Sequence, residues 1–241
     1  MNKKKMMILF SATTALTLAA CGGNNSSSST TSTEAGTAKT KYASEVTHEG
    51  TPIKGGTLKY AIVSSSPFSG IFADELSQDA TDSSIGGLVD ESMFEYDENR
   101  KLTNTGLASI EFDVENKTAT VTLNSKEYKW SDGQPVTIDD YIFAYQAIGN
   151  KDYTGVRYDG DFKNVVGMEE YHSGKADSVS GLEKVDDYTV KIHFKEMSPS
   201  MQLAGGSVSA YIMPKHIFKD IPEAEWEQSD YVRGKKFVGL G

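Results

Sequence analysis

The segment from Trp130 to Ile148 constrains the fold more than any other part of the chain. It opens with a Ser-Asp-Gly turn, because aspartate can hydrogen-bond its own backbone and glycine tolerates positive φ. Thr137 is the predicted N-cap of a helix, and Asp140 stands three residues later, where a capping box places its acid. Apolar residues then recur at helical spacing: Ile138, Tyr141, Ile142, Tyr145 and Ile148. The pattern predicts a helix over 138–148, closed by Gly149 at C′ in the left-handed conformation.

The same segment resembles a signature of the extracellular solute-binding proteins of peptide ABC transporters, the oligopeptide- and dipeptide-binding family. That signature reads W-S-D-G-x-P-(V/F/L)-T-A-x-D-V-x-(F/Y)-(S/A)-(F/Y), and the chain departs from it at Ile138 and Tyr141. Two more segments resemble the family. One is Gly-Gly-Thr-Leu at 55–58, before a β run, and the other is Tyr-Ile-Met-Pro-Lys-His-Ile-Phe at 211–218, a strand and helix start. The resemblance spans 55–241.

The N-terminus has the pattern of a secretory leader. Three lysines at 3–5 precede a short apolar run, which predicts a signal peptide over 1–21 and is too short for a stable membrane span. Leu-Ala-Ala-Cys at 18–21 resembles a bacterial lipobox, which implies that Cys21 carries diacylglycerol and an N-linked acyl chain such as palmitate. Acyl chains in this number anchor a protein stably to a membrane. A plain signal peptide with an unmodified cysteine is the alternative.

The lone cysteine and the low-complexity stretch limit what the rest can be. Cys21 is the only cysteine, which excludes an intrachain disulfide and a thiolate metal cluster. Residues 22–47 are rich in Ser, Thr and Gly and are predicted to form a flexible tether. The resemblance then implies a first part of lobe I over 48–95, a small inserted α+β domain over 96–180, and a return to lobe I over 181–241.

The remaining periodicities predict a mixed fold. Residues 110–123 and 185–194 alternate apolar and polar side chains as two hairpins, each with one buried face. Helical spacing occurs over 85–93, and short helices are expected at 168–172 and 197–203. Strands and helices mix without regular alternation, which favours an α+β or mixed α/β fold. The resemblance implies a type II periplasmic-binding-protein-like fold of the peptide-binding cluster, incomplete in this chain.

Catalytic and metal chemistry find little support. The histidines His48, His172, His193 and His216 have no metal-ligand spacing. The acid pair at 139–140 suits a helix start, and the pair at 186–187 suits a tight turn. Ser64–Ser66 lacks an identifiable base, and there is no nucleophile elbow, P-loop or dinucleotide fingerprint. We therefore expect no catalytic residue, no cofactor, no metal and no enzymatic activity.

The charge balance argues against two classes of partner. The net charge is −10, with acidic and basic residues interspersed, which suits neither nucleic acid nor an anionic bilayer surface. We expect a monomer with a solvated acidic surface.

The resemblance implies a lipoprotein at the cell membrane, facing outside, that captures oligopeptides and delivers them to an ABC permease. In the family, the loop after the first strand borders the cleft and offers main-chain groups to the extended peptide. The corresponding ligand residues are Ser65, Ser66, Pro67, Phe68, Ser69, Gly70 and Ile71. An ordinary strand-to-helix connection is the alternative interpretation of this loop.

Members of the family are much longer than this chain of 241 residues. Its end, Val238–Gly241, resembles the middle of the family's V-G-T-G-P segment. We therefore expect an N-terminal part that binds peptide weakly or not at all by itself. Two alternatives stay open: a binding protein of the same family for a nickel chelate, haem or a signalling peptide, and a surface lipoprotein remnant without a ligand.

Overall fold

The computed structural model describes residues 51, 54–57, 59, 61–64, 68–203 and 208–240. The predicted signal peptide, Cys21 and the tether lie outside these residues, as do Ser65, Ser66 and Pro67. The chain divides into two compact units, 1–58 and 59–241. The fold and site described below belong to the second unit.

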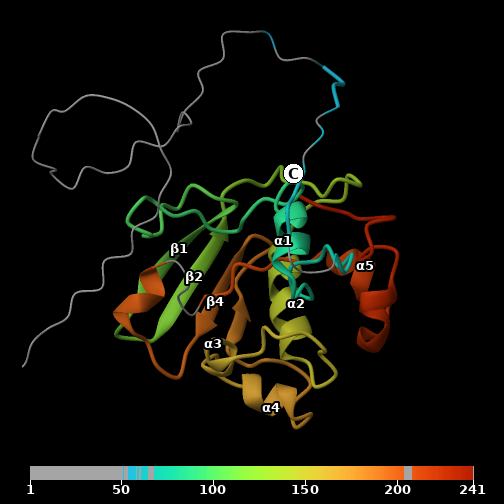
Figure 1. Cartoon of the computed structure of the whole chain (residues 1–241). Coiled ribbons are helices and arrows are strands. Elements are labelled where there is room, and N and C mark those ends of the chain that lie inside the picture. The colour runs from blue at the N-terminus through green and yellow to red at the C-terminus, as the bar shows by residue number, and fades with distance from the viewer. Residues whose placement is uncertain are drawn as a thin grey trace, which may run out of the picture. The chain divides into compact units, whose positions relative to one another are not determined.

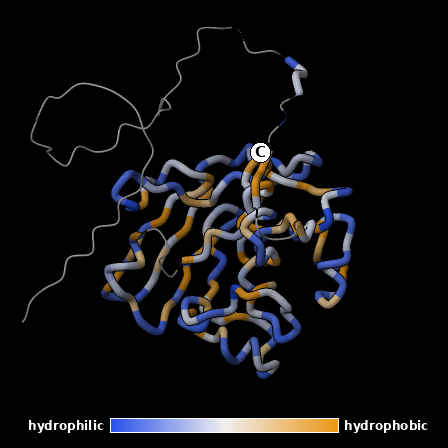
Figure 2. The backbone as a smooth tube through the Cα atoms, in the orientation of Figure 1, coloured by the Kyte–Doolittle hydropathy of each residue, from blue (hydrophilic) through white to orange (hydrophobic). Residues whose placement is uncertain are grey.

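One antiparallel sheet of four strands forms one side of this unit (Figure 1). The strands are β1 (Ala108–Asp113), β2 (Thr118–Leu123), β3 (Leu182–Lys184) and β4 (Thr189–His193), in the order β1-β2-β4-β3. Both predicted hairpins are confirmed, and hydrophobic residues recur along the strands (Figure 2). Their buried side chains form one face of the main core: Ile110, Ala119, Val121, Val190 and Ile192.

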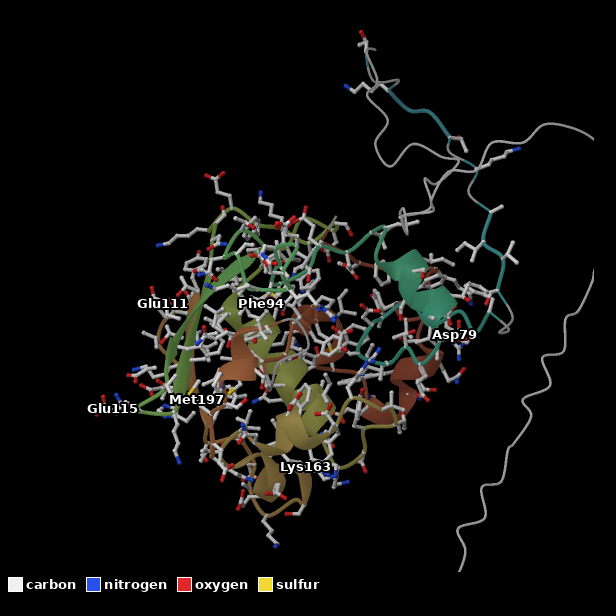
Figure 3. All side chains as sticks on the ribbon, turned by 60° about the vertical axis from the view of Figure 1, so that its left-hand side comes forward. Asp79, Phe94, Glu111, Glu115, Lys163 and Met197 are labelled. Carbon is white, nitrogen blue, oxygen red and sulfur yellow. The ribbon has the colours of Figure 1, made fainter. Side chains whose placement is uncertain are left out.

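The predicted domain boundary at 180/181 falls immediately before β3. The sheet nevertheless includes strands from both sides of that boundary, because β4 pairs with β2 from Thr118↔His193 to Thr122↔Thr189. The division of the chain into domains therefore remains a prediction. Glu111 and Glu115 project outward from the β1–β2 hairpin, whereas Phe94 is buried (Figure 3).

Helix α2 (Ile138–Gly149) lies between the sheet and the C-terminal helices, as predicted for the helix itself (Figure 1). Tyr141 and Tyr145 pack into the core beneath the sheet. Ala144 and Ala147 face a second cluster that includes Phe218 and Trp226. Since both faces of α2 are buried, the helix packs against both hydrophobic clusters and connects them.

The prediction for Gly149 was wrong. Gly149 is the last helical residue and has no positive φ, and Asn150 caps the helix in an extended conformation. A Cβ at Gly149 would lie 2.4 Å from the sulfur of Met168. Glycine is needed here because α4 (Met168–His172), the predicted short helix, approaches α2 closely.

The other helices are short. They are α1 (Ala80–Gly86), α3 (Gly160–Lys163), α5 (Lys215–Phe218) and two 3₁₀ turns, η1 (Pro199–Gln202) and η2 (Glu223–Gln228). The helical turn expected within 197–203 and the helix start after Pro214 are confirmed. Residues 211–214 form no strand; Met213 N instead donates to the carbonyl of Asp140 at 3.3 Å.

Two elements near the N-terminal side differ from prediction. The helix expected over 85–93 ends at Gly86, and Leu88 is 72% exposed. Two adjacent glycines, Gly86 and Gly87, disfavour helix propagation there, while Asp79 caps an earlier start by accepting Thr81 N at 2.8 Å. The described residues of the β run expected over 55–63 lie in no strand, because no strand of the sheet pairs with them.

Asp140 fixes the start of α2 to two other segments. Its Oδ2 accepts the main-chain N–H of Thr137 at 2.9 Å and the indole N–H of Trp130 at 3.3 Å. Its Oδ1 accepts the main-chain N–H of Lys215 at 2.9 Å. The residue is 4% exposed. One buried carboxylate therefore satisfies donors from the turn, the helix N-terminus and α5.

We expect Asp140→Asn to lower the free energy of unfolding by about 1–3 kcal/mol, measured by urea denaturation, because an amide nitrogen would face a buried N–H donor. Asp139→Asn is the matched control. It removes partly exposed ion pairs with Lys184 (2.7 Å) and Lys215 (3.7 Å) and should cost less than about 1 kcal/mol. Equal losses in the two variants would contradict this role of Asp140.

Candidate ligand-binding site

The loop predicted to meet a ligand is described from Phe68 to Ile71. Phe68 is 57% exposed, and its ring centroid lies 5.7 Å from that of Phe72. Gly70 has φ +76°, which a residue with a Cβ adopts only with strain. Ile71 is half-buried against the second core cluster. The loop thus combines one exposed aromatic ring with a turn that requires glycine.

The carboxylate of Asp82, in α1, accepts hydrogen bonds from this loop. Its Oδ2 accepts the main-chain N–H of Ser69 at 3.2 Å and also the Ser69 hydroxyl, and its Oδ1 accepts Gly70 N at 3.2 Å. Asp82 is fully buried, where a carboxylate requires hydrogen-bond donors. Sequence reasoning missed Asp82, because nothing in its own helix marks it as the partner of a loop thirteen residues earlier.

Arg233 holds the same loop from the C-terminal side. Its Nη1 donates to the carbonyl of Ser69 at 2.7 Å, and its Nε donates to the carbonyl of Glu227 at 2.6 Å. Phe72 N donates to the carbonyl of Val232 at 3.0 Å. Ser69 N, Gly70 N and Ser69 O are therefore engaged within the protein. Phe68 and Ser69 are the exposed residues in the described part of the loop, and the Phe68 ring is the large apolar group among them.

We expect Asp82→Asn to speed hydrogen exchange at the Ser69 and Gly70 amides by about tenfold or more, since a lost charge-assisted hydrogen bond is worth about 1.5–3 kcal/mol. The measurement is amide exchange followed by NMR. Asp79→Asn in the same helix is the control, because asparagine caps helices as well as aspartate does. Unchanged exchange at both amides in Asp82→Asn would contradict this anchoring.

Two cavities open beside the residues that follow the loop. The first, here called the acidic pocket, has a volume of about 300 Å³. Its lining includes four acids and two apolar side chains: Asp74, Glu75, Asp90, Glu91, Tyr211 and Ile212. The second is a cleft of about 330 Å³ whose lining includes Tyr96, Arg157 and Tyr211. Tyr211 lines both cavities, and the Arg157 guanidinium lies 5.5 Å from the centre of its ring.

Burial sets the protonation of the acidic pocket. Glu75 is 7% exposed, and burial raises its pKa to about 8, with Asp90 and Asp74 adding to the rise. Burial likewise raises the pKa of Asp90 to about 6, although Leu240 N donates to its Oδ1 at 2.9 Å. Neither acid stood out in the sequence, where Glu75 follows the predicted ligand loop and Asp90 lies in the helix expected over 85–93. Only the packing of distant segments gives them this environment.

Glu75→Gln tests the buried acid through stability. A folded-state pKa of about 8 lies above the ordinary 4.5, so the folded protein keeps a proton that the unfolded chain releases between these values. Stability from this source is present at low pH and is lost as the pH rises through about 5 to 8. We expect Glu75→Gln to remove this loss of stability. The measurement is the free energy of unfolding by urea at several pH values between about 5 and 8.

The control for this prediction is Glu98→Gln, which removes an exposed carboxylate outside the pocket. It should keep the pH dependence of the wild type. If Glu75→Gln showed the same pH dependence as Glu98→Gln, Glu75 would not titrate as described.

The residues set aside as structural have local partners. His193 Nε2 lies 2.9 Å from Glu183, and His216 Nε2 lies 2.8 Å from Asp132 of the Ser-Asp-Gly turn. Asp186 accepts Tyr188 N in the β3–β4 turn, as predicted. No group of three His, Cys, Asp or Glu residues that could hold a metal occurs in the described part of the chain. His48 lies outside that part.

Comparison with known proteins identifies the family. Residues 104–241 match the bacterial extracellular solute-binding proteins, family 5, in the region called its middle part. The chain belongs to this family, whose members are solute-binding proteins rather than enzymes. Within the described residues, no helix combines the length and the apolar character needed to cross a membrane.

Two relatives are oligopeptide-binding proteins. The chain is 37% identical over 181 residues to the oligopeptide-binding protein OppA of Lactococcus lactis subsp. cremoris, a match covering 73% of this chain and 30% of that protein. It is 29% identical over 116 residues to the oligopeptide-binding protein AppA of Bacillus subtilis, covering 48% of this chain and 18% of that protein. The chain thus spans less than a third of the length of either relative.

Solved structures confirm the predicted periplasmic-binding-protein-like fold. Lactococcal OppA, complexed with an endogenous peptide in the closed conformation, superposes with a TM-score of 0.69 at 34% identity, over 74% of this chain and 34% of that chain. Bacillus subtilis AppA in complex with a nonapeptide superposes with a TM-score of 0.57 at 26% identity, over 71% of this chain and 30% of that chain.

Proposed function

We propose that this chain contributes one wall of the peptide site in the substrate-binding component of an oligopeptide ABC importer. The observation that carries the proposal is the 37% identity to OppA across 73% of the chain. The two solved relatives named above were determined with peptides bound. The same relatives favour an oligopeptide over a nickel chelate or haem as the ligand.

The loop from Ser65 to Ile71 is the proposed contact with peptide. Its described half is held by Asp82 on one side and Arg233 on the other, so little further ordering is needed when a ligand binds. Such preorganisation reduces the entropic cost of association. Because Ser69 and Gly70 already donate inward, the Phe68 ring supplies the contact area of the described half.

Attachment to the membrane and delivery complete the proposal. The lipobox around Cys21 supports a lipid anchor, with the protein facing outside the cell and passing peptides to the permease. Cys21→Ser should release the protein from the membrane fraction into the medium, measured by immunoblotting of both fractions. Retention of the variant at the membrane would contradict lipid attachment at Cys21.

Peptide binding is tested by NMR titration of this chain with a mixed oligopeptide pool. Since the chain spans about 30% of OppA, we expect a dissociation constant of about 1 mM, near −4 kcal/mol. The amides of 68–71 should shift, and Phe68→Ala should weaken binding several-fold through loss of buried aromatic area.

Val114→Ala, which removes an exposed side chain from the β1–β2 hairpin, is the matched control and should bind as the wild type does. Absence of shifts at 68–71 with the pool in excess would contradict the proposed function of this chain. Equal weakening by both variants would contradict the role given to Phe68.

A further inference from the structure

Four carboxylate side chains line the acidic pocket. Asp74 and Glu91 are exposed, Asp90 is half-buried, and Glu75 is 7% exposed. The four acids form two adjacent pairs, Asp74–Glu75 and Asp90–Glu91, and folding brings the two pairs together around one pocket. Burial is the largest cause of the raised pKa values of Glu75 and Asp90, and repulsion from the neighbouring acids adds to it.

Glu75 has no cationic partner among the described residues. Its carboxylate accepts a hydrogen bond from its own main-chain N–H, and none of the described lysine, arginine or histidine residues forms an ion pair with it. A carboxylate buried without a partner is costly when charged. An apolar side chain at this position would give a more stable fold, so stability alone does not account for the acid.

Arg157, the basic residue that lowers the pKa of Glu75, already hydrogen-bonds to other groups of the protein. Arg157 Nη2 donates to the carbonyl oxygens of Asp74 at 3.3 Å and Ser77 at 3.1 Å, and its guanidinium lies over the ring of Tyr211. Among the influences on the pKa of Glu75, that of Arg157 is the smallest. The pocket therefore gathers four acids that form no ion pair with any of the described basic residues.

The walls and the position of the pocket suit an extended cationic side chain. Tyr211 and Ile212 supply apolar surface for a methylene stem, and the Tyr211 ring can also attract a cation. Its volume of about 300 Å³ lies at the lower end of ordinary ligand pockets. Asp74 and Glu75 follow three and four residues after Ile71, the last residue of the loop proposed to contact peptide.

We propose that the acidic pocket is a subsite for a primary ammonium group, such as a lysine side chain of a bound peptide, with Glu75 as the buried counter-charge. This inference rests on the proposed function for the source of the cation. The ammonium group donates to the Glu75 carboxylate, while Asp74, Asp90 and Glu91 attract it from the rim.

A bound cation would favour the ionised form of Glu75, so binding should strengthen as the pH rises. The groups that set this dependence are Glu75 itself, Asp90, Asp74 and the nearby Arg157. Between about pH 6 and pH 8 both Asp90 and Glu75 lose protons, since their pKa values are about 6 and about 8, whereas the lysine ammonium stays charged throughout.

The test uses two capped amino acids as probes, N-acetyl-lysine N-methylamide and N-acetyl-norleucine N-methylamide, which differ only in the ammonium group. They are titrated into the isotope-labelled chain, and the amide shifts of Asp74, Glu75 and Tyr211 are followed by NMR. At about pH 8 we expect the lysine probe to bind at least about tenfold more tightly than the norleucine probe, since a hydrogen bond to a charged group is worth about 1.5–3 kcal/mol.

Glu75→Gln should reduce the preference for lysine to about threefold or less, because a neutral amide replaces the counter-charge while the shape is kept. Glu91→Gln, at the exposed rim, gives a smaller reduction and keeps the test open if Glu75→Gln fails to fold. Glu98→Gln removes the same charge away from the pocket and should preserve the full preference.

Equal binding of the two probes, or a preference for lysine that survives both pocket variants, overturns the subsite. Shifts caused by the peptide pool at 68–71 would then still support the proposed function. Conversely, lysine-selective shifts at the pocket without any response to the peptide pool would support the cation site and overturn peptide binding by this chain.

Discussion

The carboxylate of Asp140 is the interaction on which the arrangement of this unit depends. It accepts N–H groups from Trp130, Thr137 and Lys215, which belong to a turn, a helix N-terminus and a segment seventy-five residues away. Burial raises its pKa, while these donors act in the opposite direction. A charge with so many buried donors cannot move without leaving several of them unsatisfied. The start of α2 is therefore fixed relative to the turn at Trp130 and to the segment at Lys215.

From that fixed point, α2 determines where the candidate site lies. Its tyrosines pack under the sheet, while Ala144 and Ala147 pack against the cluster that also contains Ala73 and Leu76. Small alanines on that face allow the segment after the ligand loop to approach the helix closely. The loop and the acidic pocket are thus placed by packing against a helix that itself contributes no residue to the acidic pocket.

The sequence predicted those features that local chemistry decides. The two hairpins follow from alternation, and the helix start at Thr137 follows from a carboxylate three residues on. The Trp130 segment identifies the family correctly, and its acids have structural partners: Asp132 bonds His216, and Asp140 accepts Thr137 N and Lys215 N. The helix predicted over 85–93 was wrong because its apolar spacing was given more weight than Gly86 and Gly87, which end α1. The acidic pocket could not be predicted, because burial of Glu75 depends on segments distant in the chain.

Two buried acids near the loop show why the same residue type takes different roles. Asp82 is completely buried, and three hydrogen bonds from Ser69 and Gly70 use most of the acceptor positions of its carboxylate within the fold. Glu75 is almost as buried, but it accepts only its own N–H and faces other acids. The environment of Asp82 is complete within the fold, whereas that of Glu75 lacks a positive charge. A buried acid of the second kind costs stability at neutral pH, and recognition of a cation is the function that such a cost can serve.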